Sequence, residues 1–225
     1  MKIKWGALVT DGRGKIGGHV ASKNRSGAYL RTKVTPINPQ TSAQSAVRSS
    51  FGAISQAWSG LTQALILAWN GAVADWQTTD IFGDLKKPTG KNLFLRLNQQ
   101  LEVTGQTQIT APPAKLEMIE GIVTQVEAEI GFAEITISGQ SSSTDAHLVL
   151  YATPPMSQGT TFVKNRLRQI YAVQASATSG ADMYTAYTDK YGVPTAGDNV
   201  YFGVKYVLPN GQASPLQTIK GLISA

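Results

Sequence analysis

The organisation of this chain is decided by residues 5–44, which read WGALVTDGRGKIGGHVASKNRSGAYLRTKVTPINPQTSAQ. The stretch is rich in glycine and in β-prone side chains, and it ends in a proline-bounded segment before the first helical pattern. Residues 1–48 contain nine lysines and arginines and one acid, Asp11, a net charge of +8, whereas the whole chain carries +6. The other 177 residues therefore sum to −2, and the cationic character belongs to the N-terminal part.

Length and composition limit the classes of protein to consider. With 225 residues, 42% of them hydrophobic, the chain can form one large domain or two small ones. Charged residues make up 15%, below the ~25% usual for globular domains, and neutral polar residues take their place, as on surfaces that partners cover. No apolar run approaches the ~20 residues of a membrane span, and no secretion signal is evident, so we expect no membrane partner. The absence of cysteine excludes disulfides and thiolate sites and favours synthesis in a reducing cytoplasm.

The N-terminal segment predicts a three-stranded meander. Short strands are expected over 3–9, 16–22 and 28–34, with turns at 11–14 and 24–27. The large apolar side chains are few, and a small sheet of this kind needs packing support from a helix or a neighbour. We therefore expect residues 1–40 to form a basic, β-rich attachment arm.

Residues 41–110 predict a helical region of three helices. The first spans 42–58 with Thr41 or Ser42 as its cap, and the second runs from Leu61 to about Trp76 with Ser59 as its cap. The short link between them predicts a helical hairpin. Residues 77–91 read as a loop, and a third helix follows over 93–101, capped by Thr89 and closed by Gly105. Tryptophans 58, 69 and 76 lie on the apolar stripes and are expected in the core.

Residues 111–225, which follow Pro112 and Pro113, predict a small β-sandwich. Seven short runs of branched and aromatic residues are separated by turn signals, at 116–123, 134–138, 147–152, 170–175, 183–188, 200–208 and 216–222. The fold class expected for the whole chain is α+β, with a β-rich arm, a three-helix middle and a C-terminal sandwich of the immunoglobulin or fibronectin-III kind.

Several motifs suggest catalysis or cofactor binding, but none has the context it needs. Gly12 to Gly17 matches GxGxxG, yet glycines and another turn follow where a dinucleotide fold requires a helix. His19 and His147 lie in separate regions, whereas metal sites need clustered ligands. We therefore expect no enzyme activity, no cofactor and no metal.

The cations of the arm favour binding to a partner. The residues singled out as partner-binding are Trp5, Arg13, Lys15, Lys23, Arg25, Tyr29, Arg31 and Lys33. Dispersed cations between β-prone residues suit strand addition to an acidic protein surface. Two alternatives stay open, a nucleic-acid interface with stacking aromatics and a solvated sheet edge protected by its charges. Carbohydrate binding by the sandwich has only tyrosines 184, 187 and 191 in its favour.

Residues 1–113 resemble a family of structural proteins of tailed bacteriophages that infect Bacteroidetes-type hosts, crAss-like phages included. The matching residues are Arg25-Ser26-Gly27-x-Tyr29-x-Arg31, Pro36-x-Asn38-Pro39-x-Thr41-x-x-Gln44, Arg48, Trp58, Leu61-Thr62, Trp69-Asn70 and Gly90-Lys91-Asn92-x-Phe94. The resemblance implies a virion protein, with the major capsid protein or other virion proteins as partners. The leading expectation is an auxiliary or decoration protein of the capsid; a portal, tail or head-fibre component and a packaged nucleic-acid-binding protein are the alternatives. A homo-oligomer is compatible with the sequence.

Overall fold

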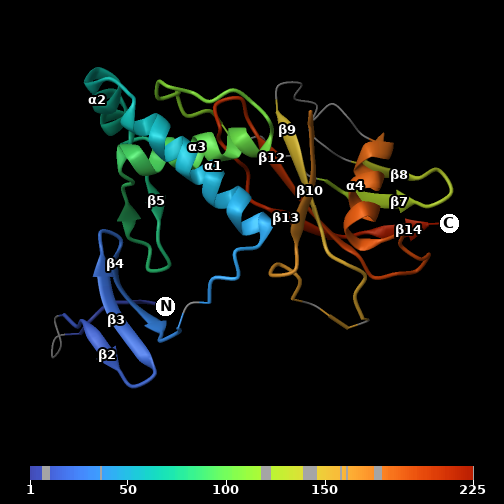
Figure 1. Ribbon diagram of the computed structural model, residues 1–225, viewed down its shortest axis with the longest axis horizontal. Coiled ribbons are helices and arrows are strands. Elements are labelled where there is room, and N and C mark those ends of the chain that lie inside the picture. The colour runs from blue at the N-terminus through green and yellow to red at the C-terminus, as the bar shows by residue number, and fades with distance from the viewer. Residues whose placement is uncertain are drawn as a thin grey trace.

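The chain folds into a mixed α+β structure with an N-terminal sheet, a helical middle and a pair of C-terminal sheets (Figure 1). The computed structural model describes residues 1–6, 11–35, 37–117, 123–138, 146–157, 159–160, 162–174 and 179–224. The α+β class expected from the sequence is confirmed. Within the described residues, no helix has the length and apolar character needed to cross a membrane.

The N-terminal sheet has four strands in the order β1-β4-β3-β2. The strands are β1 (Lys2–Ile3), β2 (Gly14–Ile16), β3 (His19–Asn24) and β4 (Gly27–Thr32). The turn at 24–27 is confirmed, but the single strand predicted over 16–22 is wrong. Gly17 adopts φ +56° and starts a tight turn with Gly18, so the chain reverses there and β2 pairs with β3. Of the strand predicted over 3–9, positions 7–9 lie outside the described residues.

Three helices follow, each opened by a threonine cap. They are α1 (Ser42–Ser59), α2 (Gln63–Ala72) and α3 (Gly90–Val103), with Thr41, Thr62 and Thr89 accepting hydrogen bonds from backbone N–H groups three residues on. The caps at Thr41 and Thr89 are confirmed. Ser59 as the cap of the second helix is wrong, because Thr62 takes that role and the helix starts later and ends earlier than expected. The C-terminal end of α3 is confirmed: Gly105 adopts φ +70°, and the Gln106 N–H bonds the Leu101 carbonyl at 2.9 Å.

The core of the helical region forms around α3. Phe94 on α3 lies edge-on to Trp69 at 5.3 Å between ring centroids, and Trp58 flanks the same ring at 5.4 Å. Trp69 and Trp76 are buried as expected, whereas Trp58 is half-buried. Helices α1 and α2 each pack against α3. The predicted hairpin of the first two helices is therefore wrong, because the buried side chains Ile54 of α1 and Trp69 of α2 pack in one cluster with those of α3.

The segment expected to be a loop between α2 and α3 contains a small β-hairpin. It consists of β5 (Thr78–Thr79) and β6 (Leu85–Lys86), which pair antiparallel. Asp80 shapes the turn, since its Oδ1 atom accepts the backbone N–H groups of Phe82 at 2.8 Å and Asp84 at 3.1 Å. A side chain that bonds the backbone two residues on is a common way to start a turn.

Two four-stranded sheets share one core in the C-terminal region, with orders β10-β9-β12-β13 and β11-β8-β7-β14. The strands are β7 (Gln125–Glu129), β8 (Glu134–Ser138), β9 (His147–Ala152), β10 (Arg168–Gln174), β11 (Ser179–Gly180), β12 (Tyr201–Val207), β13 (Gln217–Lys220) and β14 (Leu222–Ser224). Strands β8 and β9 have the predicted bounds. The strand predicted over 116–123 is displaced to β7, and its positions 118–122 lie outside the described residues. The strand predicted over 216–222 is divided at Gly221, which passes against the Phe202 ring as the chain moves between sheets.

The strand predicted over 183–188 is wrong, because this segment is part of helix α4 (Ala181–Tyr191). Met183, Tyr184 and Tyr187 recur at helical spacing and are at most 7% exposed, and α4 packs against β8 and β10. Burial on a single helical face overrode the β preference of tyrosine and threonine. The tyrosines considered for carbohydrate binding are thus mostly inside the core.

The segment after α3 is hydrogen-bonded to the helices and to the sandwich. The buried Asn98 amide bonds the backbone of Ile109 in both directions, donating at 3.1 Å and accepting at 2.8 Å. Trp69 Nε1 donates to the Thr110 carbonyl at 2.8 Å. Further along, the Gln212 side chain makes two bonds to the Leu116 backbone. Within residues 104–117, the part of this segment that the structure describes, Ile109 and Thr110 are therefore bonded to the helices and Leu116 to the sandwich.

Candidate partner-binding surface on the N-terminal sheet

Strand register places several of the arm's cations on one face of the N-terminal sheet. Lys15 lies opposite Val20, and Val20 lies opposite Arg31, so the three form a row across β2, β3 and β4. In the row beside it, Tyr29 lies between Ser22 and Lys2. Since residues two apart in a strand share a face, all six side chains are on one side. We call this set the cationic face: Lys2, Lys15, Val20, Ser22, Tyr29 and Arg31.

The cationic face is open over most of its area. Lys15 and Arg31 are exposed, and Tyr29 is half-buried between them and Lys2. Ala21, on the opposite face, is the one buried residue among the described residues of 1–35. Ile16 is also on that opposite face and is 63% exposed. The sheet therefore buries little of its own surface, as its apolar content predicts.

The other predicted partner-binding cations lie outside the paired rows that define the cationic face. Arg13 and Lys23 both approach the Asp11 carboxylate, at 3.7 and 3.9 Å. These groups are substantially exposed, and such ion pairs contribute little to stability. Arg25 is exposed in the β3–β4 turn, and Lys33 is exposed just after β4. The paired strands thus bring Lys15, Tyr29 and Arg31 together. Lys33 lies two residues beyond Arg31 on the same side, with its N–H bonded to the Gly18 carbonyl at 2.8 Å, whereas Lys23 and Arg25 lie elsewhere.

Trp5 lies against the backbone of the arm itself. A methyl group added at Gly12 would come within 2.6 Å of the Trp5 ring, so the indole covers this glycine closely. The ring nitrogen is buried and has no hydrogen-bond partner among the described atoms. Part of the ring surface that was predicted to anchor a partner is therefore used within the arm.

Two aspartates of the β5–β6 hairpin hold the N-terminal sheet to the rest of the chain. Lys4 Nζ lies 2.8 Å from Asp84 Oδ2, and the same ammonium lies 5.4 Å from the centre of the Phe82 ring. Asp80 Oδ2 lies near two further ammonium groups, 3.9 Å from Lys2 Nζ and 3.7 Å from Lys86 Nζ. These contacts cover the β1 end of the sheet and leave Lys15 on β2 open.

The neighbours of Lys4 and Asp80 favour the charged form of both side chains. The hydrogen bond to Asp84 raises the pKa of Lys4 despite some desolvation. Burial raises the pKa of Asp80, but the N–H groups of Phe82 and Asp84 and the charges of Lys2 and Lys86 lower that pKa by more. Asp80 is therefore held as a carboxylate, and its side chain is only 4% exposed. The sequence-based prediction of a loop did not include this contact. Its signal in the sequence was the pair Asp80 and Asp84 on either side of Gly83.

Helix α1 presents a second open surface. Val47 is 63% exposed and Phe51 is 49% exposed, whereas Ile54, one turn further on, is fully buried. The apolar stripe read from the sequence is therefore covered only in its C-terminal part, where α3 lies. Contiguous apolar side chains left in solvent are typical of surfaces that partners cover.

The residues considered for chemistry are not assembled into a site. His19 lies on β3 and His147 begins β9 in the C-terminal sandwich. Within the described ranges there is no group of three histidines and acids that could hold a metal ion.

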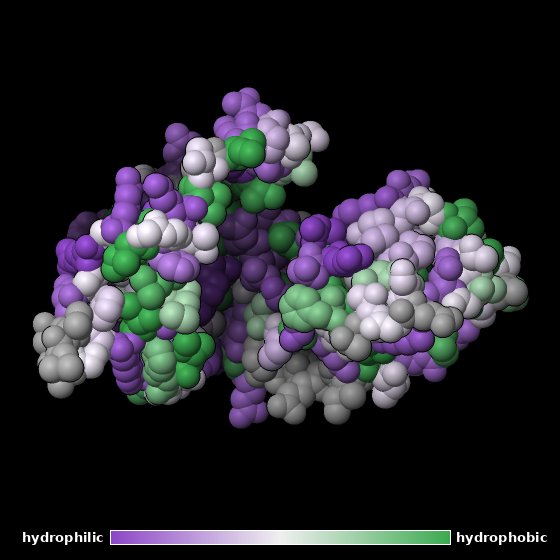
Figure 2. All heavy atoms as spheres, turned by 90° about the horizontal axis from the view of Figure 1, so that it is seen from below, coloured by the Kyte–Doolittle hydropathy of each residue, from purple (hydrophilic) through white to green (hydrophobic). Residues whose placement is uncertain are grey.

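The space-filling view from below shows the N-terminal sheet and the sandwich as separate masses with a hollow between them (Figure 2).

Comparisons with protein-family models, with curated proteins and with solved structures find no match to the chain.

Proposed function

We propose that this chain is a non-enzymatic structural protein of a tailed-phage particle, an auxiliary or decoration protein attached to the capsid through residues 1–40. The observation on which this rests is the cationic face. Its exposed Lys15 and Arg31 belong to a sheet with one buried residue among those described, and Lys2 and Lys4 of this arm contact the small β5–β6 hairpin. A face of this kind is complementary to an acidic protein surface.

The sheet also has a geometry suited to strand addition. Strand β2 is at the edge of the sheet as described, and its three residues are all exposed. An extended segment of a shell protein would pair with this edge through main-chain hydrogen bonds, while Lys15 and Arg31 meet its acids. The exposed stripe of α1 would be covered by a neighbouring subunit in the same assembly.

The C-terminal region supports an immunoglobulin or fibronectin-III type of sandwich. Strands β7, β8 and β11 share one sheet, and β9, β10, β12 and β13 form the other, which corresponds to strands A, B, E and C, C′, F, G of such domains. Helix α4 is an insertion between the strands corresponding to E and F. In the proposed particle this domain stands away from the shell, and fold alone assigns it no further role.

Binding to naked capsids of the encoding phage tests the proposal. The full chain is mixed with capsids assembled from the major capsid protein, and co-sedimentation is measured at low and physiological salt. A double variant, Lys15→Glu with Arg31→Glu, is expected to bind roughly tenfold or more weakly. The matched control, Lys164→Glu with Lys220→Glu, makes the same charge change at exposed positions of the sandwich and should bind within about twofold of the native chain.

A parallel titration with duplex DNA separates attachment to protein from attachment to nucleic acid. Affinity for DNA that falls steeply with salt and disappears in the Lys15 and Arg31 variant would replace the proposal with the nucleic-acid function. Absence of the chain from purified particles, measured by quantitative mass spectrometry, would remove the virion assignment altogether. The same measurement on separated heads and tails distinguishes a decoration protein from a portal, tail or head-fibre component.

A further inference from the structure

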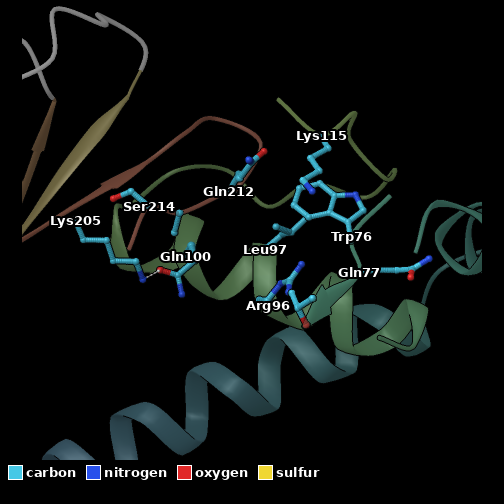
Figure 3. Close-up of a pocket in the computed structure, with 12 residues that line it drawn as sticks. Trp76, Gln77, Arg96, Leu97, Gln100, Lys115, Lys205, Gln212 and Ser214 are labelled. Carbon is cyan, nitrogen blue, oxygen red and sulfur yellow. Dashed lines mark hydrogen bonds between the residues drawn. The ribbon is translucent and has the colours of Figure 1, made fainter. Parts of the chain in front are cut away.

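A cavity of about 320 Å³ lies where helix α3, the start of β5 and the turn after β12 come together (Figure 3). Trp76 and Leu97 form its apolar wall, and Gln100, Gln212 and Ser214 supply neutral polar groups. Its size falls at the lower end of the range for small-molecule sites, and such sites are common where two domains meet.

Three cations from separate parts of the chain line this cavity. Arg96 comes from α3, Lys115 from the segment that follows it and Lys205 from β12. Among the described residues that line the cavity there is no carboxylate. The cavity therefore concentrates positive charge, although the chain outside the N-terminal part is slightly acidic overall.

Each cation is held in place by a neutral group. The Arg96 guanidinium lies over the Trp76 ring, 5.5 Å from its centre. Lys205 Nζ donates to Gln100 Oε1 at 2.5 Å, and Lys115 Nζ donates to the backbone carbonyl of Asp75 at 3.2 Å. Stacking on an aromatic ring orients the guanidinium and leaves its N–H edge for a ligand.

Among the three cations of this cavity, Lys205 is half-buried, whereas Arg96 and Lys115 are exposed. Desolvation by burial lowers the pKa of Arg96 and the pKa of Lys205. No ion pair compensates either group within the described part of the chain. A half-buried cation without a counter-charge, as Lys205 is here, is costly, and a bound anion would offset that cost.

We propose that this cavity binds a small, multiply charged oxyanion of the phosphate-ester class. Arg96 would take two oxygens of the phosphate through its N–H edge, while Lys205 and Lys115 supply charge from the other walls. A phosphate group alone does not fill the space, so the ligand has a second part that lies along Trp76 and Leu97 and contacts the side-chain amide of Gln100. The site is independent of the cationic face and of attachment to a particle.

Calorimetric titration of the full chain at low salt tests the site, with inorganic phosphate and then citrate as probes. We expect saturable binding of phosphate, weakened roughly tenfold or more by Lys205→Gln and by Arg96→Gln. Lys91→Gln, which removes an exposed charge of the same helix outside the cavity, should leave the affinity unchanged. Citrate binding with the same variant pattern would widen the class to other multivalent oxyanions.

Thermal unfolding in the presence of phosphate gives a second readout that does not depend on heat of binding. Phosphate should raise the midpoint of the native chain and of Lys91→Gln but not of Lys205→Gln. The proposal is overturned if neither small anion binds saturably, if Lys91→Gln weakens binding as much as Lys205→Gln does, or if only an oligonucleotide binds.

Discussion

The backbone of Gly211 lies directly against the backbone of Leu97, so the turn after β12 is seated on helix α3. A methyl group added at Gly211 would come within 2.5 Å of the Leu97 carbonyl oxygen, and Gly211 has φ +77°. The approach joins the sandwich to the helical region at one side of the cavity. Only glycine meets both the steric and the conformational requirement at this position.

Gly211→Ala is therefore expected to lower the free energy of unfolding by about 3 kcal/mol or more, measured by urea denaturation. The control is Gly197→Ala, where φ is +86° but no atom lies within 4 Å of the added methyl group. That control should cost only about 1–2 kcal/mol, the conformational part alone. Equal losses for the two variants would contradict the close contact.

The Asn98 side chain is expected to fix the position of the segment after α3 against that helix. It is fully buried, and its amide bonds the Phe94 carbonyl and both backbone groups of Ile109. Asn98→Ala leaves the N–H and the carbonyl of Ile109 without these partners and should lower stability by about 3 kcal/mol in thermal or urea unfolding. Asn92→Ala, at an exposed position of the same helix, should change stability by less than about 0.5 kcal/mol.

Exchanging charges between Lys4 and Asp84 tests how the N-terminal sheet is held. Lys4→Glu places like charges next to each other, so chymotrypsin should cleave after Trp5 and Tyr29 several-fold faster than in the native chain. Adding Asp84→Lys restores the opposite charges and should restore resistance. If the double variant stays as sensitive as the single one, the 2.8 Å ion pair does not hold the sheet.

The acid dependence of the same contact follows from Asp80. Its pKa is lowered below the ordinary 3.8 in the folded chain, so its contribution is present above 3.8 and is lost as pH falls through the lowered value. Hydrogen exchange of the hairpin and of β1 should therefore increase as pH falls below about 4. Asp80→Asn should remove that acid-dependent step, whereas Asp75→Asn, at an exposed position, should retain it.

The two halves of the α1 stripe should respond differently to mutation. Ile54→Ala removes a fully buried side chain and is expected to cost about 3 kcal/mol. Phe51→Ser, at a site 49% exposed, should cost less than about 1 kcal/mol in the isolated chain. A large loss for Phe51→Ser at a concentration where the chain is monomeric would show that this face is already covered.

Local signals in the sequence predicted the parts of the fold that depend on neighbouring residues. The caps at Thr41 and Thr89, the left-handed glycine at 105 and the turn at 24–27 each involve groups only a few positions apart. The bounds of β8 and β9 followed from short runs of branched residues between turns. The cationic character of the arm was visible as well, because charge is a property of composition.

Local signals could not decide which surfaces meet. Residues 183–188 have strand-like composition and became helical because that face packs on β8 and β10. Helices α1 and α2 both pack against α3 rather than against each other. Lys4 pairs with Asp84, which lies in a hairpin that the sequence had predicted to be a loop.

The sequence by itself determined the element types near strong caps and turns, the α+β class and the location of the positive charge. The tertiary structure alone decided that Lys15 and Arg31 share an open face of the sheet. It also decided that Arg96, Lys115 and Lys205 line the same cavity. The physical reason is that capping and turn energies act within a few residues. Burial and charge pairing depend instead on which distant segments the folded chain brings together.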